Sequence, residues 1–311
     1  MREANVVSVS GGKDSTATLL LAIERDVPNL TAVFADTGNE HPDTYDYVAY
    51  LEQATDVQIT RVRADFAPQI ERKRARLESG EHDWPDHLAA AALEVLVPSG
   101  NPFLDLCMWK GRFPSRMAQF CTQELKVGPI NTQVTEPLLE NHSRIVSWQG
   151  VRADESAARA KLETWALEFG DPDTGAGLWN YRPILNWTVE DVFEQHRRHG
   201  IDWNPLYEQG MSRVGCMPCV NCNKPELAQI AKRFPEELER IAEWERIVSE
   251  ASKRGCATFF AAKGETDVSL ERHGIAQKVE WAKTSRGGRQ YDLIQVAEEP
   301  MQCQSVYGLC E

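Results

Sequence analysis

Three of the eight cysteines lie within seven residues of one another, at Cys216, Cys219 and Cys222. Thiolates at this C-x2-C-x2-C spacing can ligate three irons of one [4Fe–4S] cluster, which leaves a fourth ligand to come from elsewhere in the chain. Four thiolates also suit zinc, and Cys216 with Cys219 could form a reactive dithiol. The spacing favours an iron–sulfur cluster, with zinc and the dithiol as alternatives.

A second group of residues has the composition of a phosphate-binding loop. Two glycines let the backbone turn sharply and present N–H groups to an anion. A lysine adds positive charge, and an aspartate either shapes the loop or helps to hold Mg2+. The spacing is not that of a Walker A loop. The predicted nucleotide-binding residues of this loop are Ser10, Gly11, Gly12, Lys13, Asp14 and Ser15.

The elements that must position this loop read as a parallel sheet. Apolar runs at 5–9, 30–35, 57–62 and 145–148 predict buried strands, and helical spacing separates the first three. We also predict a possible strand at 181–185, a helix that Thr188 caps with Asp191 at N3, and a long helix at 225–253. Strands alternating with helices form βαβ units, so we predict an α/β fold with a doubly wound, mostly parallel sheet. Ligands bind such sheets at the carboxyl ends of the strands. Both the loop and the next candidate residues, Asp36, Thr37 and Gly38, fall there; Asp36 could bind Mg2+ or a nucleotide hydroxyl, or simply cap a helix.

A later segment carries two arginines close to Gly150. The guanidinium groups of Arg152 and Arg159 suit phosphate or sulfate oxygens, and Glu155 could hold one of them in place. The alternative is an ion-pair network at a helix start. The run from Pro183 to Tyr207, which contains NPLY, is assigned to the fold rather than to chemistry.

Four of these motifs together resemble a known family. SGGKDS is similar to the PP-loop of the adenine nucleotide α-hydrolase superfamily, a Rossmann-like fold. DTG-x-x-x-P-D-T, G-x-R-x-x-E-S-x-x-R and the later NPLY…GC-x-x-C resemble elements of the PAPS reductase family, over about residues 5–222. The resemblance implies binding of ATP, APS or PAPS with Mg2+, and cleavage of ATP between its α and β phosphates.

The same resemblance supplies a fourth cluster ligand. Cys121 stands in CTQELK, which is similar to the C-T-x-x-[LI]-K element that carries cluster cysteines in APS reductases. This chain has one cysteine there, not two, and has an added Cys222. The implied ligand set is therefore Cys121 plus Cys216, Cys219 and Cys222. Cys303 and Cys310 lie in a C-terminal tail that lacks the family's ECGLH-like ending, although a tail thiol could still carry sulfur.

Three functions are weighed. In the first, the chain is an ATP pyrophosphatase and sulfurtransferase that activates a substrate oxygen by adenylation, as the resemblance to DNA-phosphorothioation sulfurtransferases implies. In the second, it reduces APS or PAPS to sulfite. In the third, it is a non-catalytic subunit that senses nucleotide or redox state. The tail and the cysteine spacing favour the first, and its implied partners are a cysteine desulfurase and further subunits.

Composition sets the remaining expectations. Lys plus Arg number 34 and Asp plus Glu number 47, a net charge of −13. Proteins that grip nucleic acid through its phosphates are usually basic, so any such contact must be local or come from a partner. No apolar run is long enough for a membrane span, and a cytoplasmic protein is expected. We place a boundary near residue 200, between a nucleotide-binding domain (1–200) and a smaller helical cysteine-cluster region (201–311).

Overall fold

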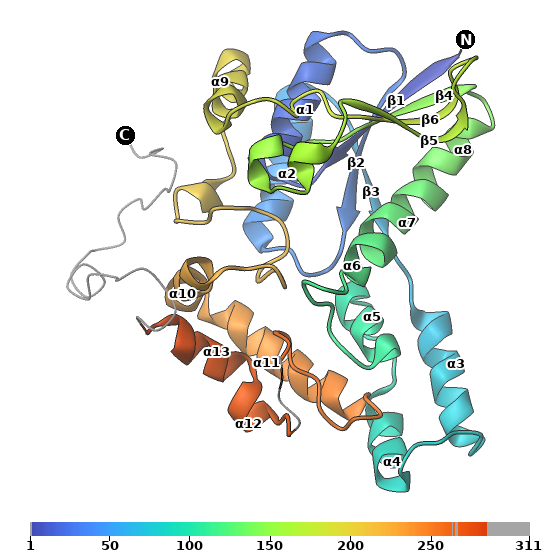
Figure 1. Cartoon of the computed structure of the whole chain (residues 1–311), viewed down its shortest axis with the longest axis vertical. Helices are drawn as coiled ribbons and strands as arrows, with labels where there is room; N and C mark the ends of the chain where they lie inside the picture. Colours follow the sequence, from blue (N-terminus) through green and yellow to red (C-terminus); the bar gives the residue numbers. More distant parts are fainter. Residues whose placement is uncertain (1, 263, 265–266, 285–311) are drawn as a thin grey trace.

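The computed structural model describes residues 2–262, 264 and 267–284. Its centre is a six-stranded sheet of order β3-β2-β1-β4-β6-β5 (Figure 1). The strands are β1 (Glu3–Val9), β2 (Leu30–Asp36), β3 (Ile59–Arg63), β4 (Arg144–Trp148), β5 (Trp165–Asp171) and β6 (Ala176–Tyr181). β5 pairs antiparallel with β6 and every other pairing is parallel. The predicted α/β fold with a mostly parallel sheet is confirmed.

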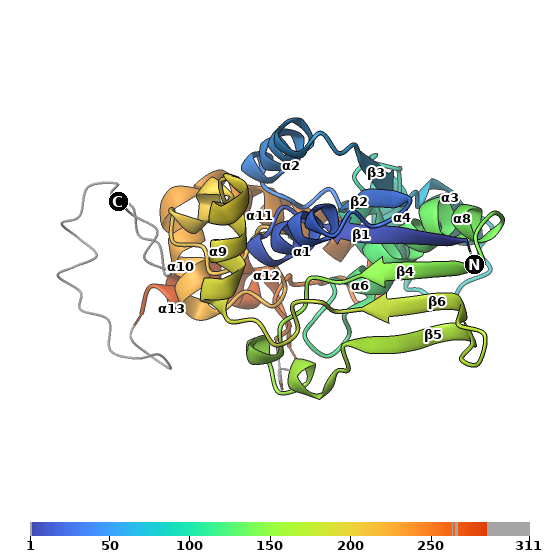
Figure 2. The ribbon, with the colours of Figure 1, turned by 90° about the horizontal axis from the view of Figure 1, so that it is seen from above.

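Apolar residues of the strands pack into two separate hydrophobic cores, one on either face of the sheet. Val7 and Val9 of β1 pack on one face with α1 (Lys13–Glu24), α2 (Pro42–Thr55) and α9 (Val189–His199). Ala4 and Val6 pack on the other face. Viewed from above, the helices lie on both sides of the strands (Figure 2). Burial on both faces explains why apolar residues of β1 point to both sides of the sheet.

A continuous helical segment, Phe120–Leu139, covers the second face. Its α-helical turns α6 (Phe120–Thr122), α7 (Gly128–Ile130) and α8 (Glu136–Leu139) alternate with π-helical turns at Gln123–Val127 and Asn131–Thr135. Pro129 and Pro137 each follow a π-helical turn by two residues. Proline removes an amide donor from the helix ladder, and a wider turn accommodates that loss.

The remaining helices form a helical lobe beside the sheet (Figure 1). Within the described residues, none of the helices has the length and apolar composition needed to cross a membrane. The lobe consists of α3 (Ala67–Glu78), α4 (Asp86–Val95), α5 (Pro102–Lys110), α10 (Lys224–Arg233), α11 (Pro235–Glu250), α12 (Leu270–His273) and α13 (Ile275–Ala282).

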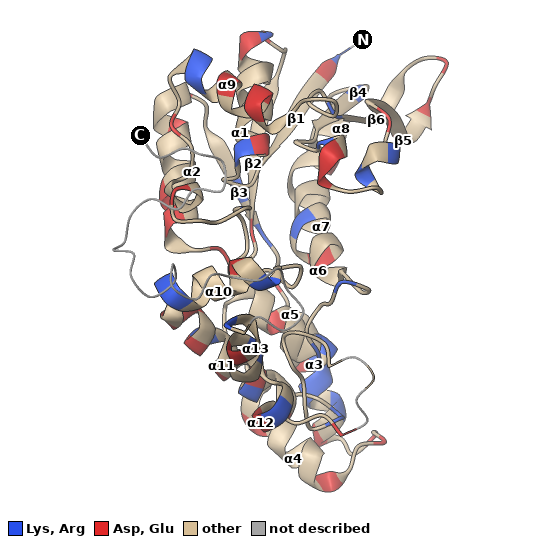
Figure 3. Ribbon diagram, turned by 60° about the vertical axis from the view of Figure 1, so that its left-hand side comes forward, with Lys and Arg blue, Asp and Glu red and all other residues tan. Residues whose placement is uncertain are grey.

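Helix α3 carries the run of basic residues that is coloured blue in Figure 3. Arg72 and Arg76 are exposed. Lys73 instead points inward, where its ammonium donates to the carbonyls of Met108 at 2.6 Å and Ala251 at 2.7 Å. These carbonyls lie at the C-terminal ends of α5 and α11, where backbone acceptors lack helical partners. Only part of the run is therefore a solvated face.

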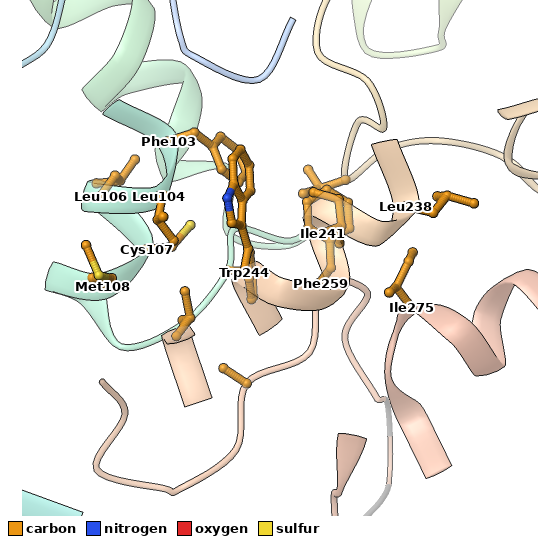
Figure 4. Close-up of a cluster of buried hydrophobic side chains, with 14 of the residues drawn as sticks. Phe103, Leu104, Leu106, Cys107, Met108, Leu238, Ile241, Trp244, Phe259 and Ile275 are labelled. Carbon is orange, nitrogen blue, oxygen red and sulfur yellow. The ribbon is translucent and has the colours of Figure 1, made fainter. Parts of the chain in front are cut away.

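One hydrophobic core fills the lobe and joins segments from both sides of residue 200. Phe103 of α5 stacks on Trp244 of α11 with ring centroids 5.6 Å apart, and lies 6.2 Å from Phe259 (Figure 4). Leu238 and Ile275 complete this side of the core. The boundary near residue 200 stays a proposal, and residues 66–125 share a core with residues beyond it.

Two element predictions differ from the structure, and one strand was not predicted. The possible strand at 181–185 lies instead at Ala176–Tyr181, because the chain turns directly after Tyr181. Its hairpin partner β5 was not predicted. The single long helix expected from Pro225 to Lys253 is divided into α10 and α11 at Pro235, since proline cannot continue the preceding helix.

Candidate functional site

The loop between β1 and α1 turns sharply at Gly11 and leads into the N-terminus of α1. Gly11 has φ +73°, a conformation that favours glycine, and a Cβ there would stand 2.7 Å from Thr44 Cγ2. Both the backbone conformation and the lack of space therefore favour glycine at this position. Ser15 Oγ accepts from the Ser10 N–H at 3.0 Å and lies 3.1 Å from Ser10 Oγ. The loop is thus closed on itself at the N-terminus of α1, where backbone N–H groups favour anions.

The NPLY segment braces this loop from behind. The Lys13 N–H donates to the Tyr207 hydroxyl at 2.9 Å, and Asn204 Nδ2 donates to the Gly11 carbonyl at 3.2 Å. His196 Nε2 lies 3.0 Å from the Lys13 carbonyl, and burial lowers the pKa of that imidazole. The assignment of this segment to the fold understated its position, because it contacts the loop itself.

Lys13, Asp14 and Arg152 form one buried chain of charges beside the loop. Asp14 Oδ2 lies 3.0 Å from Lys13 Nζ, and Asp14 Oδ1 lies 2.5 Å from Arg152 Nε. Arg152 is only 5% exposed and also pairs with Asp154 at 2.5 Å. Gly150 permits this approach, since a Cβ there would stand 2.8 Å from the Asp14 carbonyl oxygen.

The second predicted arginine is placed differently. Arg159 forms an ion pair with Glu155 on the surface of its own segment. Glu155 also accepts from the Arg152 N–H at 3.2 Å. The structure brings Arg152 to the loop, whereas Arg159 is connected to the loop through Glu155 and Arg152.

The Asp36-Thr37-Gly38 element lies next to the loop because β1 and β2 are neighbouring parallel strands. Asp36 Oδ1 accepts from the Gly38 N–H at 2.9 Å and the Tyr45 hydroxyl at 2.7 Å, while Asp36 Oδ2 lies 3.5 Å from Arg63 Nε. Its carboxylate is thus oriented by three donors at the carboxyl end of β2. Thr37 is fully buried and donates to Glu40 Oε1 at 2.6 Å.

One segment, Val214–Met217, connects the cysteine motif to both nucleotide motifs. Cys216 Sγ lies 3.5 Å from Thr37 Oγ1 and 3.6 Å from Glu40 Oε1. The Met217 N–H donates to the Asn39 carbonyl at 2.7 Å. At its other end, the Val214 carbonyl oxygen would lie 3.3 Å from a Cβ at Gly12. A sulfur atom therefore sits beside the predicted nucleotide cradle.

The four predicted ligand cysteines are related through Cys219. Cys219 interacts electrostatically with Cys121, Cys216 and Cys222. Burial raises the pKa of the Cys216 thiol to about 12, and also raises the pKa values of Cys121 and Cys222. Within the described part of the chain, no three His, Cys, Asp or Glu side chains are gathered closely enough to enclose a metal ion. Cys303 and Cys310 lie outside the described residues.

Two cations oppose the effect of burial on these thiols. The pKa of Lys126 is raised by the negative charge of its neighbours, of which Cys216 contributes most, followed by Glu40, Cys219 and Cys121. Burial of Arg213 disfavours its charge, but the nearby Cys219, Glu226, Cys216 and Cys222 raise its pKa overall. A negative group held by the cysteines would have these two cations beside it.

Comparison with known proteins identifies the family. The family model "Phosphoadenosine phosphosulfate reductase domain" matches residues 4–222. The chain belongs to this family. It is 51% identical over 327 aligned positions to the "Uncharacterized 37.8 kDa protein in gpa 5'region" of Escherichia phage 186, covering 99% of this chain and 96% of that protein.

More distant family members carry enzyme names. The "Phosphoadenosine 5'-phosphosulfate reductase" of Erwinia tasmaniensis is 24% identical over 229 positions, covering 74% of this chain and 76% of that protein. The solved "phosphoadenylyl-sulfate (PAPS) reductase from Candida auris, phosphate complex" is 17% identical, with a TM-score of 0.40, over 69% of this chain and 82% of that one.

In this member of the family, three residues near the cysteines were not singled out as site residues from the sequence, although Glu40 and Lys126 stand inside the quoted motifs. Glu40 contacts the Cys216 thiol, and Lys126 and Arg213 face the cysteines electrostatically. Lys126 follows Cys121 by five residues and Arg213 precedes Cys216 by three. Their closeness in sequence to a predicted ligand cysteine could have pointed to these two cations, since clustered thiolates favour nearby positive charge.

Proposed function

We propose that this chain is an ATP pyrophosphatase and sulfurtransferase. ATP binds at the loop Ser10–Ser15, a substrate oxygen attacks the α-phosphorus, and pyrophosphate leaves. A sulfur nucleophile then displaces AMP from the activated atom. The observation that carries the proposal is the contact of Cys216 Sγ with Thr37 Oγ1 at 3.5 Å, because it puts a thiol next to a nucleotide motif.

The nucleotide roles follow from the charges around the loop. Lys13 supplies positive charge to the phosphates, and Arg152 provides a guanidinium fork for the anionic part of the substrate. Asp14 holds both cations and is, with Asp36, a candidate ligand for Mg2+, which prefers carboxylate oxygens. Gly38 and Gly150 let the backbone come close at both edges of the site. Arg159 acts on Arg152 through Glu155.

The cysteines fit a [4Fe–4S] cluster in number and chemistry. Cys121, Cys216, Cys219 and Cys222 are free thiols, and Cys219 interacts with each of the other three. The cluster would supply an iron site that receives or delivers sulfur. Lys126 and Arg213 would offset its negative charge. Four thiolates also suit zinc, so metal analysis must accompany any test.

A second candidate function is the reduction of APS or PAPS to sulfite. The specific observation in its favour is the match of residues 4–222 to the family model, with relatives named as reductases. A sulfonucleotide would occupy the same loop, and Arg152 would face its sulfate or phosphate oxygens.

The decisive experiment incubates anaerobically purified protein with ATP, APS or PAPS separately, with Mg2+ and a thiol reductant, and identifies the products. AMP and pyrophosphate from ATP support the first function. Sulfite from APS or PAPS supports the second and overturns the first. Tight nucleotide binding without turnover, in the presence of a sulfur donor and candidate acceptors, favours a non-catalytic sensing subunit.

A further inference from the structure

A large basic cleft lies at the end of α5 that is remote from the strand ends. Its volume is about 1090 Å3, and α3, the C-terminal end of α5 and the segment after α11 line it. This exceeds the ~300–1,000 Å3 of ordinary small-molecule pockets. Its lining includes none of the predicted nucleotide-binding residues and none of the four predicted cluster-ligand cysteines, so the proposed function leaves it unexplained.

The charge of this cleft is the opposite of that of the whole protein. Of the residues that the structure describes, five cations line it and no carboxylate does: Lys73, Lys110, Arg112, Lys253 and Arg254. Lys73 is already bound to backbone carbonyls. Two have ion-pair partners beyond the lining, Glu124 for Lys110 and Asp83 for Lys253. Arg112 and Arg254 are exposed, and neither has a carboxylate partner among the described residues. Because the whole chain has a net charge of −13, this local excess of positive charge distinguishes the cleft from the protein as a whole.

Two tryptophans separate the cleft from a second, smaller hollow. Trp84 and Trp109 line both, and the second hollow of about 370 Å3 adds Arg72 and Arg76 (the blue face of α3 in Figure 3). The Trp109 ring already contacts Phe66 and, at 3.7 Å, Lys110 Nζ. Trp84 is half-buried like Trp109, and Lys73 Nζ lies 5.4 Å from the centroid of its ring, so a planar ligand on Trp84 would lie beside a positive charge.

We propose that this cleft binds single-stranded nucleic acid. Positive charge that tracks a backbone, interleaved with an aromatic face for unpaired bases, is the combination that single-strand binding needs. A ligand that carries only phosphate would make no use of Trp84. In a duplex the bases are stacked within the helix and cannot lie on the ring.

The cleft is also connected to the proposed active site. Asn101 at the N-terminus of α5 donates to the Gly38 carbonyl at 2.7 Å, and Lys110 at the other end lines the cleft. The nine residues of α5 span about 13 Å at 1.5 Å per residue. Arg112 lies over the Phe120 ring at 5.5 Å, directly before Cys121. A bound strand can extend from the cleft towards the cysteines.

The test measures binding of a fluorescein-labelled 20-mer of deoxythymidine, and of its uridine counterpart, by anisotropy at 50 and 200 mM NaCl. We expect binding that weakens with salt. Arg112→Glu combined with Arg254→Glu should weaken it at least tenfold and flatten the salt dependence. Trp84→Ala should weaken it severalfold, whereas Trp84→Phe should retain most of the affinity because an aromatic face remains.

The matched control is Lys232→Glu, an exposed lysine on α10 outside the cleft, made singly and together with exposed Arg2→Glu for equal charge change. The control variants should bind within twofold of the parent, and ATP affinity of the cleft double variant should be unchanged. Absence of oligonucleotide binding at 50 mM NaCl overturns the proposal. So does equal weakening by the cleft and control pairs, or full displacement by inorganic polyphosphate together with a silent Trp84→Ala. ATP turnover is measured separately, so failure of the proposed function is distinguishable.

Discussion

The guanidinium of Arg152 lies 2.5 Å from the carboxylate of Asp14, across 138 residues of sequence. That carboxylate also holds Lys13, so the cations offered to a nucleotide are kept apart by a shared anion. In the proposed nucleotide site, a phosphate would compete with Asp14 for both of them. Asp14 therefore keeps two buried cations compensated while no phosphate is bound, as buried charges require.

Lys13→Ala is expected to weaken ATP binding while the fold remains intact. Loss of one charged hydrogen bond costs about 1.5–3 kcal/mol, roughly a 10- to 150-fold increase in Kd. Calorimetric titration with ATP measures the change, and thermal unfolding checks the fold. Unchanged affinity and turnover would show that the loop is not the phosphate site.

The two arginines should respond unequally to replacement by lysine. Arg152→Lys loses the fork that joins Asp14 and Asp154, and should reduce kcat/KM at least tenfold. Arg159→Lys preserves a surface ion pair with Glu155 and should stay within about threefold of the parent, since such pairs contribute only ~0–1 kcal/mol. Equal losses would place Arg159 on the substrate as well.

Cys→Ser replacement at Cys121, Cys216, Cys219 or Cys222 should each remove or destabilise the cluster. Anaerobically purified parent protein should be brown, with about four irons per chain. Cys107→Ser and Cys256→Ser are the controls, as neither belongs to the proposed ligand set. Iron and zinc analysis with visible absorption spectra measures the outcome. Iron retention that needs Cys303 or Cys310 but not Cys121 would overturn the ligand set, and stoichiometric zinc without reconstitution of iron would exclude the cluster.

Glu245 should make the stability of the helical lobe depend on pH. Burial raises the pKa of its carboxyl to about 7, although the Phe259 and Ile275 N–H groups donate to it and oppose the shift. A carboxyl whose pKa is higher in the folded than in the unfolded protein contributes its full stabilisation at pH values below the unfolded-state pKa. That stabilisation is lost as the pH rises through the folded-state pKa of about 7. The free energy of unfolding should therefore fall between pH 4.5 and 7, by up to about 3 kcal/mol from this group.

Glu245→Gln isolates this contribution. The variant cannot ionise, so the difference between its unfolding free energy and that of the parent should change across this pH range and be constant above it. Urea denaturation at pH 5, 6, 7 and 8 measures the difference. A constant difference at every pH would mean that Glu245 does not titrate there.

Local signals were sufficient for the sheet centre and the loop. The apolar run of β1 followed by Gly11 and Gly12 carries its own strand, turn and helix start, and Thr188 with Asp191 forms the expected capping box of α9. β5 was missed because it is an edge strand with mostly exposed residues, such as Phe169, and lacks a clear apolar alternation. Its pairing with β6 is visible only in three dimensions.

The basic cleft could not be predicted from the sequence either. Its cations come from separate segments around residues 110 and 253, which only the packing of α5 against α11 brings together. The run of basic residues on α3 predicts surface charge only in part, because Lys73 and Arg74 donate hydrogen bonds to backbone carbonyls. Long-range packing, not local charge density, determines which cations face a ligand.

The segment Val214–Met217 contacts Thr37 and Asn39 at one end and approaches Gly12 at the other. A ligand taken up at Cys216 and a nucleotide taken up at the loop therefore act on one shared piece of backbone. Thermodynamic reciprocity then applies: whatever factor the sulfur ligand imposes on nucleotide affinity, the nucleotide imposes on the affinity for that ligand. Under the proposed function, the affinity for nucleotide would therefore change with the sulfur load of the protein, and by the same factor in the other direction.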